Sequence, residues 1–185
     1  MHLENDKYIV NIAVDTTYTV DSADNKPYDL VFNPANMKHK DYSKTFCIEV
    51  VMHEQTKTMA LIGSLYCYDS DCAVLEEDIL TVLQNNLITQ IDLSSNRLVL
   101  HKVLDTFGCN FGIYRNSNYY VIYGEIEITR LNEQFEKVWT FSGGDIFVSQ
   151  NERCPFELED DKIKLNDWNG NYYEIDLNGN LILMR

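Results

Sequence analysis

Proline is scarce in this chain of 185 residues, which contains only three, and no apolar run approaches the roughly 18 residues of a membrane-spanning helix. The first seven residues, MHLENDK, are polar and do not resemble a secretory signal. We therefore expect a cytoplasmic protein without a membrane partner.

Basic residues are also few. Lys and Arg together number 15 against 29 Asp and Glu, and the formal net charge is -14. Because nucleic-acid phosphates repel a chain this acidic, we expect no nucleic-acid partner. The charge suits a basic protein partner, although acidity also serves solubility alone.

Catalytic fingerprints are missing as well. The chain has no P-loop, no dinucleotide-binding glycine motif and no G-x-S-x-G nucleophile motif. Its five cysteines form an odd set without regular spacing, and without an export signal we expect them to be reduced thiols. No local context marks one of them as a nucleophile.

Two sequences that could suggest metal binding are incomplete. The stretches 167–171 and 176–180 place oxygen-bearing side chains as the start of a calcium loop does, but their Gly is fourth, whereas an EF-hand has it sixth. Cys67 and Cys72 could form half of a zinc site, but an obvious second ligand pair is missing. We expect no metal and no cofactor.

An internal repeat is the most informative feature that is present. The segments 75–93 (LEEDILTVLQNNLITQIDL), 113–131 (IYRNSNYYVIYGEIEITRL) and 158–177 (LEDDKIKLNDWNGNYYEIDL) each contain an apolar-alternating stretch, a turn and a second stretch that ends in Leu. The pattern predicts three antiparallel hairpins. Asn-Gly pairs at 169–170 and 178–179 predict type I′ turns.

The repeat also decides between helix and strand. Residues 73–86 have the apolar spacing of a helix, but the matching residues 158–177 alternate polar and apolar side chains and have Asn-Gly near their middle. We therefore predict a strand over 79–83.

The N-terminal part differs from the repeats. It predicts strands over 8–20, 45–53 and 58–68, with Gly63 marking a bulge or a close contact. We expect residues 1–70 to form a β segment that packs on the three repeats of residues 71–185, in one compact domain.

The repeats resemble the blades of β-propeller proteins, especially the quinoprotein-like repeat, in which a strand pair ends in an apolar-Asp-apolar step and a further strand ends in Trp. The stretch from Leu131 to Phe141, which contains Trp139, is the closest match. The resemblance implies an all-β fold of antiparallel meanders. Three copies are too few for a ring of about 4–8 blades, so we expect an open sandwich or an incomplete propeller-like arrangement.

A second resemblance concerns the stretches 139–148 (WTFSGGDIFV) and 167–173 (DWNGNYY). They are similar to a tail found in small uncharacterised bacterial proteins, a group that includes immunity proteins paired with secreted toxins. The resemblance implies a stand-alone bacterial module and no established activity.

Six residues are candidates for partner binding. An exposed Trp on a turn is typical of an interface anchor, although it can also fold back onto its own sheet. The acidic runs 157–161 and 76–78 occupy equivalent repeat positions and would form either a negative ridge or a set of solvated turns. The candidates are Asp145, Glu159, Asp160, Asp161, Asp167 and Trp168.

Three functions remain open on the sequence. The first is a non-catalytic protein-binding module, for example an immunity or antitoxin-like protein that masks a basic, toxin-like partner. The second is a hydrolase with a dispersed carboxylate site, since many acidic residues are available. The third is a structural β module that self-assembles through its strand edges. We rank the binding module first, and the sequence leaves the oligomeric state undetermined.

Overall fold

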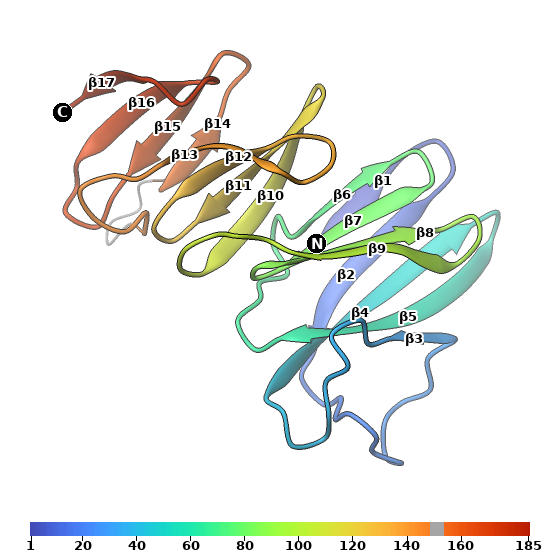
Figure 1. Cartoon of the computed structure of the whole chain (residues 1–185). Helices are drawn as coiled ribbons and strands as arrows, with labels where there is room; N and C mark the ends of the chain where they lie inside the picture. Colours follow the sequence, from blue (N-terminus) through green and yellow to red (C-terminus); the bar gives the residue numbers. More distant parts are fainter. Residues whose placement is uncertain (149–153) are drawn as a thin grey trace. The chain divides into compact units, whose positions relative to one another are not determined.

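The computed structural model describes residues 1–148 and 154–185, and in this part every regular element is a β-strand. No helix here is long and apolar enough to cross a membrane. The strands form four open sheets, mostly antiparallel, as the repeat pattern predicted (Figure 1). The chain divides into two compact units, residues 1–104 and 105–185.

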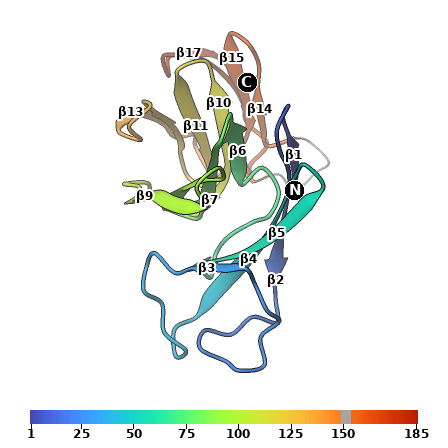
Figure 2. The same cartoon turned by 90° about the vertical axis from the view of Figure 1, so that its right-hand side faces the viewer.

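The first sheet of the N-terminal unit has five strands in the order β1-β2-β4-β5-β3, with β3 parallel to β5. Its strands are β1 (His2–Glu4), β2 (Ile9–Asp15), β3 (Leu30–Phe32), β4 (Ser43–Met52) and β5 (Gln55–Ser64). The two long connections on either side of β3 gather at one end of this sheet (Figure 2).

The second sheet is a meander of four strands in chain order. They are β6 (Ala73–Glu76), β7 (Ile79–Gln84), β8 (Leu87–Asp92) and β9 (Arg97–Val103). The strand predicted over 79–83 is confirmed. The apolar spacing that imitates a helix arises because β7 is buried on both faces, so its side chains need not alternate.

The first and second sheets of the N-terminal unit share one hydrophobic core. Members that are almost completely buried include Val10, Phe46 and Leu61 from the first sheet and Leu80, Val82 and Ile91 from the second. The close contact expected at Gly63 is confirmed. A Cβ atom there would lie 2.2 Å from Oε1 of Gln84, which comes from the second sheet.

The C-terminal unit consists of two further four-stranded meanders. The third sheet contains β10 (Asn110–Asn116), β11 (Tyr119–Gly124), β12 (Ile128–Leu131) and β13 (Lys137–Phe141). The fourth contains β14 (Phe156–Leu158), β15 (Lys162–Asn166), β16 (Tyr172–Asp176) and β17 (Leu181–Met184). Their shared core is rich in aromatic rings, with Phe156 stacked on both Tyr114 and Tyr123.

Each of the three meanders has an irregularity at the same place. The last strand carries one extra residue in its pairing with the strand before it: Val99 in β9, Val138 in β13 and Ile182 in β17. These side chains are 53 %, 55 % and 58 % exposed. Such bulges bend an edge strand and hinder further pairing along its free edge.

The Asn-Gly hairpins exist, but their turn type differs from the prediction. The Gly170 amide donates to the Asp167 carbonyl at 3.0 Å, and the Asp167 amide donates to the Asn171 carbonyl at 3.1 Å. The positive φ falls on Gly170, at 86°. This is the pattern of a three-residue loop with a type I turn followed by a left-handed glycine, so the type I′ prediction was wrong.

Candidate functional site

The six residues predicted from the sequence belong to two separate groups. Asp145, Asp167 and Trp168 lie near the C-terminal end of β15, whereas residues 159–161 form the turn that precedes it. Strand β15 has five residues and spans roughly 17 Å, so the two groups lie about that far apart. The structure therefore does not gather the six residues into one patch, and their role in binding stays a prediction.

The first group takes part in an internal network. Asp145 accepts a hydrogen bond from the Asn169 amide at 2.7 Å and another from the Ile146 backbone amide at 2.7 Å. The Trp168 backbone amide donates to the Ile146 carbonyl at 2.8 Å. The Trp168 side chain remains 44 % exposed. Only Trp168 in this group therefore presents a large apolar surface to solvent.

Asp167 lies inside this network and is only 2 % exposed. Its carboxylate accepts hydrogen bonds from the Tyr173 hydroxyl at 2.8 Å and from the side-chain amide of Asn171 at 2.8 Å. Burial alone would raise the pKa of Asp167, but these hydrogen bonds lower it below its ordinary value. The buried charge holds the loop to the sheet and is poorly placed to meet a partner.

The second group lies at the turn between β14 and β15. Glu159 forms ion pairs with Lys164 and, at 3.9 Å, with Lys162, so its charge is largely compensated within the sheet. Asp160 and Asp161 are exposed at the tip of the turn. These two carboxylates are the predicted residues that remain open to solvent.

A stronger concentration of negative charge lies in the N-terminal unit. An open pocket of about 460 Å³ is lined by Glu76, Glu77, Asp78 and Asp92, together with polar side chains. Ile79 at the start of β7 pairs with Asp92 at the end of β8. The turn before β7 and the turn after β8 therefore meet at one end of these two central strands, which brings the four carboxylates together. We call them the acidic pocket.

Local hydrogen bonds shape the acidic pocket. Asp78 accepts from the Lys7 ammonium at 3.0 Å and from the Tyr8 hydroxyl at 3.0 Å. Asp92 accepts from the Ser94 hydroxyl at 2.7 Å and from the Ser95 amide at 3.1 Å. These hydrogen bonds lower the pKa of Asp92 to about 2, so this carboxylate stays charged throughout the physiological range.

Lys7 shows which kind of group one carboxylate of the acidic pocket binds. Its ammonium group is the cation placed against Asp78, and a second open pocket beside Asn5, Asp6 and Lys7 shares Glu77 as a wall. Within residues 1–148 and 154–185, no group of three or more His, Cys, Asp or Glu side chains has the arrangement of a metal site. Carboxylates bind ammonium and guanidinium groups by charge and hydrogen bonds, as Asp78 binds Lys7.

Sequence reasoning singled out the run 76–78 but missed Asp92. Asp92 belongs to the Ile-Asp-Leu step that closes the repeat, and the same position holds Asp176 in the fourth sheet. Both side chains accept backbone amides of the following turn. The Ile-Asp-Leu step thus has a structural role. Only the pairing of Asp92 with Ile79 reveals that Asp92 also faces the acidic turn at residues 76–78.

Comparison with known proteins assigns the chain to no family. No protein-family model matches the chain, and no curated protein matches it. Similar solved structures include BamB from Moraxella catarrhalis, with 10 % identity over 78 % of this chain and 47 % of that one, at a TM-score of 0.46. Hsv2p of Kluyveromyces lactis has 11 % identity over 76 % of this chain and 46 % of that one, at 0.44.

The CNH domain of AfRom2 is similar in the same way, with 11 % identity over 78 % of this chain and 47 % of that one, at a TM-score of 0.48. These neighbours are β-propeller-like, and none of them supports the resemblance to immunity proteins. The chain spans about half the length of each neighbour.

Proposed function

We propose that this protein is a non-catalytic binding module whose acidic pocket receives a lysine or arginine side chain of a basic protein partner. The observation that supports the proposal is the meeting of Glu76, Glu77, Asp78 and Asp92 around one open pocket. Lys7 pairs with Asp78, which is one of these four carboxylates.

Electrostatics gives the proposed interaction its character. A solvent-exposed ion pair contributes only about 0–1 kcal/mol, so one carboxylate is a weak anchor. Several carboxylates around one cation add their attractions, and the net charge of -14 increases the rate of encounter with a basic partner. Both effects weaken with salt, so the complex should be sensitive to ionic strength.

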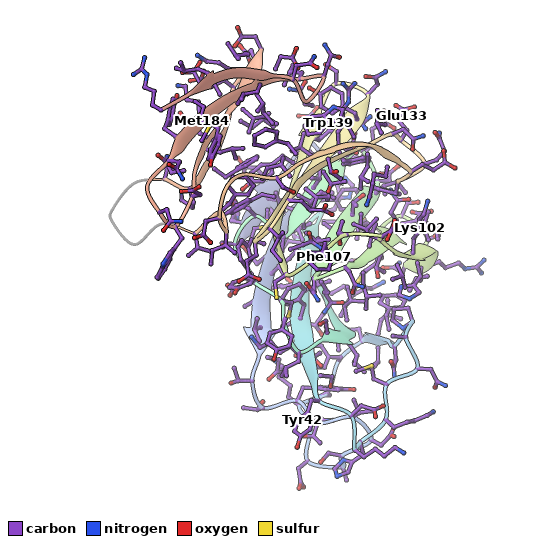
Figure 3. The ribbon with its side chains drawn as sticks, turned by 60° about the vertical axis from the view of Figure 1, so that its left-hand side comes forward. Tyr42, Lys102, Phe107, Glu133, Trp139 and Met184 are labelled. Atoms are coloured by element: carbon purple, nitrogen blue, oxygen red, sulfur yellow. The ribbon has the colours of Figure 1, made fainter. Side chains whose placement is uncertain are left out.

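The proposed partner is a basic protein, and a toxin masked by an immunity protein would be one such partner. Aromatic side chains could extend the contact. Tyr42, at 84 % exposed, projects from the loop before β4 (Figure 3). Tyr42 lies at the end of the β4–β5 hairpin that is remote from the turn. Met52 and Gln55, beside the turn, line a small cavity together with Tyr8. Tyr8 in turn donates a hydrogen bond to Asp78 of the acidic pocket. We therefore assign the first contact to the acidic pocket and not to Tyr42.

Calorimetry with a short lysine-rich peptide tests the proposal. The variant Glu77→Gln/Asp92→Asn removes two charges from the acidic pocket, and the control Asp160→Asn/Asp161→Asn removes two exposed charges from the equivalent turn of the fourth sheet. We expect the pocket variant to bind about tenfold more weakly, equal to about 1.4 kcal/mol, and the control to bind nearly as well as the unchanged protein.

The same titration at raised salt provides a second readout. Weaker binding by the unchanged protein is expected, because added ions screen exposed charges. Equal losses in the two variants would show that only the overall charge matters and would contradict a specific role for the acidic pocket. The reverse ranking would move the binding site to Asp160 and Asp161.

A further inference from the structure

A cysteine and a lysine lie against each other on the first sheet, away from the acidic pocket. Lys26 comes from the connection between β2 and β3, and its ammonium group lies 3.7 Å from the Cys47 sulfur on β4. Cys47 is half-buried, and the Lys26 side chain is 52 % exposed. A small oxidant can therefore approach the thiol, and the amine is already beside it.

The surrounding residues hold these two groups in place. The Asp15 carboxylate lies 3.4 Å from the Lys26 ammonium and accepts a hydrogen bond from the Tyr28 hydroxyl at 2.6 Å. The Asp15 side chain is only 5 % exposed. Its pKa is lowered because hydrogen bonds from Tyr28 and Thr17 outweigh the effect of burial. A fixed, ionised Asp15 thus anchors Lys26 at the sulfur.

The neighbouring strands leave room at the sulfur. Cys47 pairs with Ala13 on β2 and with Ala60 on β5, and both have side chains of a single carbon. The ring of Tyr28 completes the contacts, with its centroid 5.0 Å from the Lys26 ammonium group. Lys26 is thus the amine that the described structure places beside this sulfur.

We propose that Cys47 is an oxidation site at which a peroxide generates a sulfenic acid that Lys26 captures as a covalent sulfur–nitrogen bridge. In the first step the sulfur attacks one peroxide oxygen, the O–O bond breaks, and the thiol becomes a sulfenic acid while one water leaves. Sulfur is oxidised by two electrons and the peroxide is reduced.

In the second step the Lys26 nitrogen, having lost a proton to solvent, attacks the electrophilic sulfur. The S–N bond forms and the S–O bond breaks. The departing oxygen takes a second proton from the nitrogen and leaves as water. The sulfenic acid and the ammonium group therefore yield a sulfenamide, one water and one proton, with no further change in oxidation state. A thiol reductant returns the bridge to the free thiol and amine.

The bridge would fasten the connection between β2 and β3 to the sheet beneath it. At present Lys26 is held through ion pairing with Asp15 and the contact with Cys47. A covalent bond would replace these exchangeable contacts. The proposal does not depend on the acidic pocket, and its failure would leave the proposed binding function untouched.

Hydrogen peroxide applied to the full chain tests the inference, with peptide mapping by mass spectrometry as the readout. We expect a peptide containing Lys26 joined to one containing Cys47, with a net loss of two hydrogen atoms that dithiothreitol reverses. Cys154 is the internal control, because it is exposed and its sulfur contacts the Phe156 carbonyl at 2.9 Å. It should gain oxygen without forming a bridge to lysine.

The variant Lys26→Arg keeps a cation beside Asp15 but removes the amine. We expect complete loss of the bridged peptide and oxygen addition at Cys47 in its place, whereas Cys47→Ser should abolish both products. Oxygen addition at Cys47 of the unchanged protein, with Lys26 left unmodified, would overturn the proposal. A bridge that retains an oxygen atom would also overturn it, because the product would not be the direct S–N bond.

Discussion

Gly179 lies directly against the indole of Trp139, and a Cβ atom on this glycine would be 2.8 Å from the ring. The contact joins the turn between β16 and β17 to strand β13 of the third sheet. Trp139 also donates from Nε1 to the Leu177 carbonyl at 3.2 Å, and Arg130 donates to the same carbonyl at 2.7 Å. The side chain of Trp139 is labelled in Figure 3. Two donors and one close approach thus fasten the fourth sheet to the third.

Gly179→Ala should destabilise the C-terminal unit more than Gly170→Ala. Both glycines have a similar positive φ, 84° at Gly179 and 86° at Gly170, so both substitutions place Ala in the unfavourable left-handed region. A Cβ at Gly170 meets nothing within 4 Å, whereas one at Gly179 clashes with Trp139. We expect about 1 kcal/mol of lost stability for Gly170→Ala and about 2–4 kcal/mol for Gly179→Ala.

Urea unfolding followed by tryptophan fluorescence measures both variants. The chain has two Trp residues, and both belong to the C-terminal unit, so the signal reports on that unit. Equal destabilisation by the two substitutions would show that backbone strain alone decides the result and that the contact with Trp139 adds nothing.

Much of this fold follows from local sequence. The alternation in residues 158–177 and the Asn-Gly pairs specify strands and hairpins, because turn residues and side-chain period act over a few positions. The bulges at Val99, Val138 and Ile182 left no such signal, since an extra apolar residue in an apolar strand does not interrupt the pattern.

The acidic pocket was less accessible to sequence reasoning. The run 76–78 is conspicuous, but Asp92 lies fourteen positions beyond Asp78 and joins it only through the pairing of β7 with β8. The number of acidic residues was also a poor guide to the binding candidates. The carboxylate of Asp167 accepts internal hydrogen bonds, and that of Glu159 forms internal ion pairs. A residue's partners depend on register, which composition does not record.

Gly63→Ala should disrupt the contact between the first two sheets. The new Cβ would overlap the amide of Gln84, which is 1 % exposed and donates from Nε2 to the Leu61 carbonyl at 3.2 Å. We expect a loss of about 2–4 kcal/mol in the free energy of unfolding, measured by urea denaturation followed by circular dichroism.

The double variant Gly63→Ala/Gln84→Ala provides the control. Shortening Gln84 makes room for the added methyl group, so the two changes together should cost less than the sum of the separate changes. Additive losses would mean that Gly63 is needed for a reason other than its contact with Gln84.

Cys67 and Cys72 should resist alkylation in the folded protein. Burial raises the pKa of Cys67 to about 11 and that of Cys72 to about 12, so at pH 8 almost none of either thiol is ionised. Cys154 is exposed. We expect iodoacetamide to label Cys154 rapidly and the two buried thiols only after unfolding, as measured by mass spectrometry with and without urea. Equal labelling rates in the folded state would contradict their burial.

Asp167 should make the stability of the C-terminal unit sensitive to acid. Hydrogen bonds from Asn171 and Tyr173 lower its pKa in the folded state despite burial, whereas the unfolded carboxyl titrates near pH 3.9. The carboxylate therefore contributes stability above about pH 4, and this contribution is lost as the pH falls through the lower folded value. Asp167→Asn should cost about 1–3 kcal/mol at pH 7, with a difference that shrinks below pH ~4.

A series of urea unfolding curves from neutral to acidic pH measures this dependence through tryptophan fluorescence. Asp160→Asn is the matched control, because Asp160 is exposed at the other end of β15. It should leave both the stability and its pH dependence nearly unchanged. A difference in the free energy of unfolding between Asp167→Asn and the unchanged protein that stayed constant from neutral to acidic pH would contradict the prediction. It would show that the hydrogen bonds from Asn171 and Tyr173 do not stabilise the charged form of Asp167.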